Sequence, residues 1–326
     1  MIGQMLGQPV ECGAPAVGSS TPKPSYSHPT SYYLKCVAGG VFACGLTHTF
    51  VCPLDIVKCN MQANPTKYKS MGMSYQALVA ESGYSWFKLG WLPTLIGYSL
   101  QGSAKFGFYE LFKDIYGGFI SNNFSEESAV TFRTLIWATA SASAELIADV
   151  LLCPFEAVKV RIQTSDKGTF PTTFGAGWNK IMTTEGTNGF YKGLAPLWGR
   201  QVPYTIMKFV VFEKTVSIIF DNILQKKREE FGKAFNLSMT FLAGYVAGVV
   251  CAIVSHPADS LFTAYNKKKT DGAFMVEIKK IYKDMPQGGL WKGLVARIFM
   301  VGTLTGLQWW IYDSWKAACG LKPTGS

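Results

Sequence analysis

Residues 48–58 read His48 Thr49 Phe50 Val51 Cys52 Pro53 Leu54 Asp55 Ile56 Val57 Lys58, and this stretch decides the fold because it recurs twice more. An apolar run meets a proline, an acid follows two residues later, and a base stands three residues after the acid. The other copies read Cys153 Pro154 Phe155 Glu156 Ala157 Val158 Lys159 and His256 Pro257 Ala258 Asp259 Ser260 Leu261 Phe262. Their prolines are 101 and 103 residues apart, which indicates three units of about a hundred residues.

The composition is typical of a membrane protein. Of 326 residues, 48% are hydrophobic and only 16% are charged. Gly, Ser, Thr and occasional charges interrupt the apolar runs, so we expect the helices to face a partly polar interior, as in a channel or carrier. The net charge of +10 suits anionic lipids or an anionic substrate, and no basic reading helix indicates nucleic acid.

The cysteines and the known catalytic motifs give no indication of an enzyme. The eight cysteines are scattered without paired spacing, so neither a disulfide framework nor a zinc site is predicted. No nucleophile motif and no phosphate-binding loop is recognisable. We therefore expect no enzymatic activity and no cofactor.

The pattern predicts an all-α membrane protein with six transmembrane helices in three pseudo-symmetric two-helix repeats, each with a short helix between its long ones. The long helices are expected at about 33–62, 93–116, 131–163, 196–220, 237–265 and 295–315, and the short ones at about 74–81, 174–185 and 274–283. The repeats would span 33–128, 129–234 and 235–318. A flexible tail rich in Gly, Pro and Ser is expected over 1–32, and a second tail over 319–326.

These repeats resemble the mitochondrial carrier family, whose three two-helix units each carry the Pro, acid, base motif and, after a short helix, an acid, Gly, aromatic, Lys, Gly motif. More narrowly, five strings are similar to its phosphate carrier branch: SLQGSAKFGFYE (99–110), SASAE (141–145), KVRIQ (159–163), RQVPY (200–204) and GTLT (302–305). The resemblance implies import of inorganic phosphate with a proton, or in exchange for hydroxide, by alternating access across the mitochondrial inner membrane.

The resemblance also bears on topology and lipids. Six spans place both termini on one side, and the loops after the first, third and fifth long helices are rich in lysine, so these loops should face the matrix and the termini the intermembrane space. Anionic inner-membrane lipids such as cardiolipin are expected partners.

The family pattern further implies a matrix gate of salt bridges between neighbouring helices. Asp55 would pair with Lys159 and Asp259 with Lys58, whereas Glu156 faces a phenylalanine and would have no partner. Two glutamines, each four residues past a motif lysine, could brace these pairs: Gln62 and Gln163.

A second, cytoplasmic gate is implied at the opposite ends of the even-numbered long helices. There Glu213 would pair with Lys316 and Asp313 with Lys113. Glu110 would face Val216, which stands where the pattern expects a base. Each gate would therefore hold at most two bridges, weak enough to break and re-form during transport.

Counting within the repeats predicts a substrate site. Fifteen residues after the glycine that precedes each even-numbered helix lie Lys105, Lys208 and Gln308, at one depth. Two lysines in mid-membrane are costly unless an anion meets them. Arg200 would add a bidentate phosphate contact. Further hydrogen-bond donors to the anion are Gln101 and Tyr204.

Three ionisable residues near the prolines are expected to carry the coupled proton. His48 and Asp149 lie five residues before the first and second prolines, and Glu145 lies one helical turn before Asp149. Two carboxyl groups and an imidazole in an apolar bundle have shifted proton affinities. His48 has no histidine counterpart in the other units, so the gate does not need it.

Two alternatives remain open at this stage. The substrate could be another anion, or a metal ion bound through Cys44, His48 and Glu145. The chain could also have become a structural subunit of a larger inner-membrane complex, because two motif bases are missing.

Overall fold

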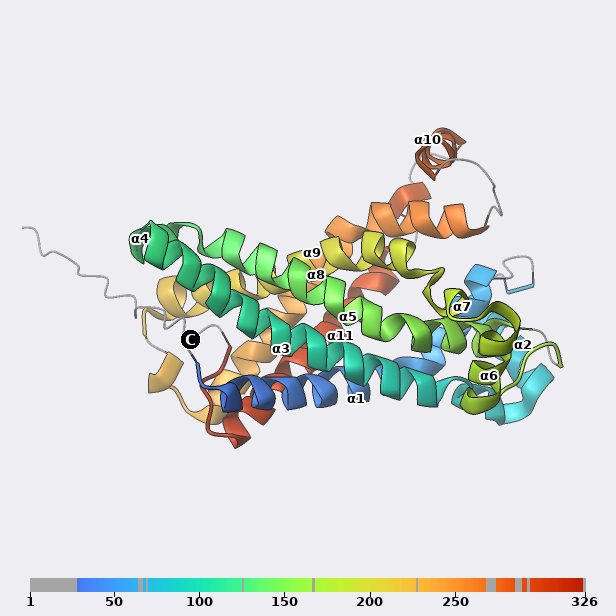
Figure 1. The fold of residues 1–326 in the computed structure, drawn as a ribbon, viewed down its shortest axis with the longest axis horizontal. Coiled ribbons are helices and arrows are strands. Elements are labelled where there is room, and N and C mark those ends of the chain that lie inside the picture. Colours follow the sequence, from blue (N-terminus) through green and yellow to red (C-terminus); the bar gives the residue numbers. More distant parts are fainter. Residues whose placement is uncertain are drawn as a thin grey trace, which may run out of the picture.

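The computed structural model describes residues 28–63, 67–68, 70–124, 126–165, 168–226, 228–267, 274–284, 289–291 and 294–324. Every regular element in these residues is a helix, as predicted (Figure 1). The six long helices are α1 (Thr30–Ala63), α3 (Trp91–Asn123), α5 (Arg133–Thr164), α8 (Leu194–Ser217), α9 (Lys233–Lys267) and α11 (Leu294–Ala318). The predicted tail falls outside the described residues over 1–27, and α1 begins three residues earlier than expected.

Shorter elements connect the long helices. They are α2 (Met71–Ser82), η1 (Gly83–Lys88), α4 (Glu126–Thr131), α6 (Phe174–Glu185), α7 (Asn188–Tyr191), the π-helical turn η2 (Ile218–Leu224), η3 (Arg228–Glu230), α10 (Phe274–Asp284) and η4 (Gly289–Trp291). The three predicted short helices are α2, α6 and α10.

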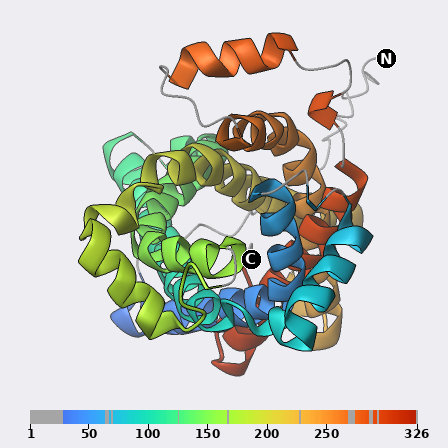
Figure 2. The ribbon, with the colours of Figure 1, turned by 90° about the vertical axis from the view of Figure 1, so that its right-hand side faces the viewer.

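The long helices form a closed ring. Each packs against the next in chain order, and α11 packs against α1 (Figure 2). We call the end that carries α2, α6 and α10 the motif end, and the opposite end, where α1 begins and α11 finishes, the terminal end. There the Lys35 Nζ donates to the Cys319 carbonyl at 3.1 Å, and the Trp315 indole donates to the Lys35 carbonyl at 2.9 Å.

Three of the described helices are long and apolar enough to cross a membrane: Thr30–Met61, Arg133–Thr164 and Lys233–Pro257. They belong to α1, α5 and α9, the first long helix of each repeat. The second long helix of each repeat, α3, α8 or α11, carries buried charged side chains.

Pro53 lies inside α1, which continues through it to Ala63, close to the end expected at 62. A proline removes one backbone donor and need not end a helix whose faces are packed on neighbours. α5 and α9 likewise contain Pro154 and Pro257.

Glycines allow the two helices of a repeat to touch backbone to backbone. A Cβ on Gly40 would lie 2.1 Å from the Gly102 carbonyl oxygen, and one on Gly248 would lie 2.7 Å from the Gly302 Cα. The same close contact therefore recurs in the first and third repeats, and it keeps the polar inner faces of both helices together.

The short helix α6 is fastened to the motif end of α5. The Arg161 guanidinium donates to Glu185, with Nη2 to Oε2 at 3.0 Å, and the Lys192 ammonium lies 2.8 Å from the same carboxylate. These donors lower the pKa of Glu185 to about 2. The carboxylate is therefore charged at any physiological pH.

Candidate functional site

Half of a polar layer inside the ring is built from α3, α5 and α8. The Gln101 amide donates to Glu145 at 3.1 Å and to Asp149 at 3.0 Å, so one side chain joins both carboxyl groups. The Lys105 ammonium lies 2.8 Å from Glu145 and 3.4 Å from the Thr205 hydroxyl. All five residues are buried, and Oδ2 of Asp149 has no hydrogen-bond partner among the described residues.

The other half of the layer joins α8, α11 and α1. The Lys208 ammonium donates to the side-chain oxygen of Gln308. The Gln308 amide nitrogen in turn lies 3.1 Å from Nε2 of His48 and 3.4 Å from the Thr47 hydroxyl. The His48 ring stacks on Tyr98, with centroids 3.8 Å apart. Lys208 and Gln308, which were predicted to lie at one depth, contact each other through this bond.

The two lysines of the layer differ in their partners. Lys105 faces the carboxylate of Glu145, whereas Lys208 faces an amide oxygen, and among the described residues no carboxylate lies within ion-pair distance of it. Both are at least 96% buried. A buried ammonium without a counter-charge is costly, so the Lys208 side of the layer favours an anion.

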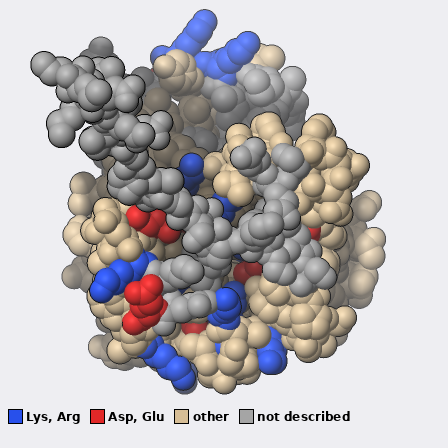
Figure 3. Space-filling view, turned by 90° about the vertical axis from the view of Figure 1, so that its left-hand side faces the viewer, with Lys and Arg blue, Asp and Glu red and all other residues tan. Residues whose placement is uncertain are grey.

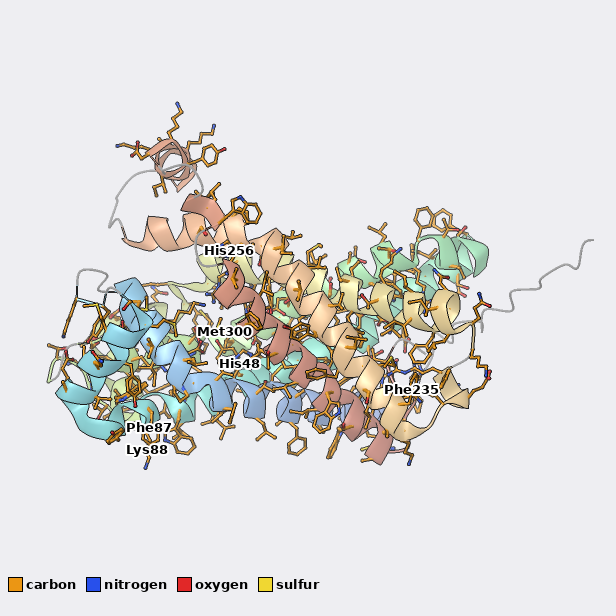
Figure 4. The ribbon with its side chains drawn as sticks, turned by 180° about the vertical axis from the view of Figure 1, so that it is seen from behind. His48, Phe87, Lys88, Phe235, His256 and Met300 are labelled. Atoms are coloured by element: carbon orange, nitrogen blue, oxygen red, sulfur yellow. The ribbon has the colours of Figure 1, made fainter. Side chains whose placement is uncertain are left out.

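Two further predicted substrate contacts, Arg200 and Tyr204, lie on α8. Arg200 is exposed on α8, nearer the motif end than Lys208. The Tyr204 carbonyl accepts from the Cys251 thiol at 3.2 Å. Figure 4 shows His48 within the bundle and His256 nearer the end that carries α10, where it stacks on Trp291.

At the motif end, Lys159 lies 3.2 Å from Asp55, which is the predicted pair between α5 and α1. Glu156 does have partners, contrary to expectation: it lies 3.7 Å from Lys159 on its own helix and accepts from the Tyr98 hydroxyl at 3.3 Å. The tyrosine was not predictable from the motif because it comes from α3. The Asp259 side chain lies outside the described residues, so its pairing with Lys58 stays a prediction.

In the described conformation Gln163 does not contact the pair of Asp55 and Lys159. Its amide donates to the Leu89 carbonyl at 3.2 Å and to the Cys52 sulfur at 3.6 Å, and so fastens the start of α3. The Gln62 side chain lies outside the described residues.

At the terminal end the predicted pairs of Glu213 with Lys316 and of Asp313 with Lys113 are wrong. The ion pairs between helices run around the ring in the opposite direction to the predicted one. Lys113 lies 3.3 Å from Glu213 and 3.3 Å from Glu110, and Lys316 lies 3.5 Å from Glu110. Glu213 on α8 thus meets a base of α3, and Glu110 on α3 meets a base of α11. Each of these acids pairs with the helix that precedes its own in the cyclic order α3, α8, α11. Figure 3 shows acidic and basic side chains beside one another at this end.

Asp313 is paired with Arg228 at 3.0 Å instead of Lys113. If Asp313 followed the same pattern, its base would come from α8 at position 216, but that residue is a valine. Arg228, in the connection between α8 and α9, supplies the positive charge instead.

The two ends differ in burial. The acids of the motif end, Asp55 and Glu156, have side chains that are 20% and 21% exposed, whereas Glu213 and Asp313 at the terminal end are 1% and 0% exposed. A cluster of aromatic side chains lies against the terminal-end pairs and is also buried: Phe106, Tyr109, Phe209, Phe212, Trp309 and Tyr312. The described conformation is therefore closed at the terminal end.

Comparison with known proteins agrees with this architecture. The family model described as "Mitochondrial carrier protein" matches residues 29–119, 132–222 and 233–322. The chain belongs to the mitochondrial carrier family.

Curated relatives of this carrier cover nearly its whole length. It is 49% identical over 315 residues to "Phosphate carrier protein, mitochondrial" of Caenorhabditis elegans, covering 96% of this chain and 89% of the relative. It is 50% identical over 285 residues to "Solute carrier family 25 member 3" of Bos taurus, covering 87% and 76%. It is 45% identical over 315 residues to "Probable mitochondrial phosphate carrier protein" of Schizosaccharomyces pombe, covering 96% and 99%.

Several residues of this carrier's site were not predicted from its sequence. Tyr98 lies two helical turns before Lys105, and Thr205 lies one turn before Lys208, so helical spacing places both on the same faces as the lysines. That signal could have identified them. For Arg228 no repeat-based signal exists, since it lies outside the repeated pattern.

Proposed function

We propose that this protein is a mitochondrial phosphate carrier that moves phosphate with a proton across the inner membrane by alternating access. The observation that carries the proposal is Lys208, a buried ammonium whose described partner is the neutral Gln308 amide. An entering phosphate would supply the missing negative charge. The names of the curated relatives support phosphate as that anion.

Lys105 gives the site a second cation whose availability depends on protonation. Its ammonium is held by Glu145, and the Gln101 amide joins Glu145 to Asp149. Two nearby carboxyl groups favour the uptake of one shared proton. Once Glu145 is neutral, Lys105 is free to bind phosphate, so binding of the proton and of the anion support each other.

His48 links this layer to the motif end. Its ring accepts from Gln308, which also receives the Lys208 bond, and stacks on Tyr98, whose hydroxyl reaches Glu156. A proton on His48 would therefore affect both Lys208, through Gln308, and the motif-end pair, through Tyr98. We propose His48, Glu145 and Asp149 as the proton-coupling residues.

Two gates would alternate around this layer. The terminal-end pairs close one side in the described conformation, and the pair of the buried Lys159 with Asp55, whose side chain is 20% exposed, would help to close the other. An ion pair with one partner open to water is weaker than a fully buried pair, which permits reversible opening. Arg200, Tyr204 and Lys58, which lie toward the motif end, would meet phosphate on its way through.

The proposed orientation places the motif end in the matrix and both termini in the intermembrane space. The lysine-rich connections at the motif end support it, since positive loops remain on the inner side. The same lysines would attract anionic lipids such as cardiolipin.

The test is uptake of labelled phosphate into proteoliposomes with an imposed pH gradient. Uptake should be faster when the gradient drives protons in the same direction as phosphate, and unlabelled phosphate should compete whereas dicarboxylates should not. Uptake that ignored the gradient would exclude proton symport, and the absence of phosphate uptake would favour a structural role in a larger complex.

A further inference from the structure

The terminal-end gate has a missing base and a buried acid that needs one. Val216 stands where α8 should present the partner of Asp313, and the Asp313 side chain is fully buried. An uncompensated carboxylate in that position would cost several kcal/mol. Its charge must be met from elsewhere in the molecule.

Arg228 of η3 meets that charge. Its Nη2 lies 3.0 Å from Oδ2 of Asp313 and also donates to the Thr240 hydroxyl, while Nη1 donates to the Thr324 carbonyl. The guanidinium lies over the Phe220 ring, 5.4 Å from its centroid. The side chain is 3% exposed, so these contacts are shielded from water and from salt.

Thr324 saturates the other oxygen of Asp313. Its backbone N–H and its hydroxyl donate to Oδ1 at 3.1 and 2.9 Å, and its hydroxyl accepts from the Lys316 ammonium at 3.4 Å. Thr324 is itself buried. The residues after α11 thus fold back between Asp313 and Lys316 as part of the network.

The network continues around the ring from this point. Lys316 lies 3.5 Å from Glu110, and Lys113 lies 3.3 Å from both Glu110 and Glu213. Because these residues stand on α11, α3 and α8, the contacts that begin at Arg228 reach all three repeats. Arg228 is therefore connected to every charged residue of this gate.

We propose that Arg228 is the third base of the terminal-end gate, a positioning residue that replaces the base absent at Val216 and holds the gate closed through Asp313 and Thr324. This proposal rests on the proposed alternating access, since a gate presupposes it. A guanidinium suits the role because its planar donors can bind several acceptors at once.

The experiment compares Arg228→Gln, Asp313→Asn and the double variant with the unchanged full-length carrier in lipid nanodiscs. Thermal unfolding reports stability, and hydrogen–deuterium exchange reports opening at each helix end. Arg228→Gln should lower the melting temperature, and the double variant should recover most of the loss, because it no longer buries an unpaired carboxylate. Lys226→Gln, an exposed neighbour, is the control and should change neither measurement.

The exchange measurement tells whether Arg228 holds the whole terminal end closed or stabilises only the residues next to it. In Arg228→Gln and in the double variant, amides at the terminal ends of α3 and α8, across the ring from Arg228, should exchange roughly tenfold faster or more. Faster exchange confined to residues 228–240 and 310–324 would overturn the proposal, as would a double variant no more stable than Arg228→Gln. Neither readout requires transport, so a carrier that failed to move phosphate would leave this result interpretable.

Discussion

The Lys105 ammonium lies 2.8 Å from the Glu145 carboxylate, in a layer where both side chains are almost wholly buried. An anion that binds Lys105 must therefore displace an internal carboxylate of the protein. In the proposed mechanism, protonation of that carboxylate would remove the competitor, so this single contact would connect the proton with the substrate.

Glu145→Gln tests this connection. The variant should transport phosphate with little dependence on an imposed pH gradient, because the amide cannot take up the coupled proton. Uptake into proteoliposomes with and without the gradient measures the effect. Glu81→Gln removes a carboxylate from an exposed ion pair with Lys67 and is the matched control, which should keep full gradient dependence. A Glu145→Gln variant that retained it too would exclude Glu145 from coupling.

Lys208→Gln should weaken phosphate binding more than it weakens folding. Removing the charge that faces Gln308 deletes the main attraction for the anion, and we expect the apparent KM for phosphate to rise by roughly tenfold, since a charged hydrogen bond contributes about 1.5–3 kcal/mol. Lys214→Gln, an exposed lysine on the same helix, should leave KM unchanged. Equal KM values for the two variants would contradict a substrate role for Lys208.

The repeat made the architecture and the depth of the central layer predictable. A motif that recurs at a constant spacing places equivalent residues at equivalent heights, which is why Lys208 and Gln308 could be matched before any contact was known. Gln101, Glu145 and Asp149 were also chosen from the sequence, although their common hydrogen bonds were not foreseen.

The partners at the terminal end were not predictable in the same way. Spacing along each helix places Glu110, Glu213 and Asp313 at one level, but it does not tell whether an acid faces the next helix or the preceding one. That depends on how the helices rotate and tilt as they pack. Arg228 lay beyond such reasoning altogether, because its segment has no counterpart in the repeated pattern.

The pair of Asp55 and Lys159 should behave as a weak, reversible link between the first two repeats. A double-mutant cycle with Asp55→Asn and Lys159→Gln, read out by thermal unfolding, is expected to give a coupling energy below about 1 kcal/mol, since the Asp55 carboxylate is partly exposed. The transport rate should nevertheless change in each single variant, because the pair would close the motif end. Variants of the exposed pair Lys192 and Glu185, which lies within one repeat, should leave transport unchanged.

Gly90 and Gly193 occupy equivalent places before α3 and α8, yet they should respond differently to alanine. Gly90 has a φ of +73°, and a Cβ there would lie 3.0 Å from the Gln163 amide, whereas Gly193 has a φ of −86° with open space around it. Because a left-handed conformation costs an L-residue roughly 1–2 kcal/mol, Gly90→Ala should lower stability by about that amount. Gly193→Ala should be neutral or slightly stabilising, since it restricts only the unfolded chain. Thermal unfolding of both variants in the same detergent measures the difference, and equal melting temperatures would show that the start of α3 relaxes freely.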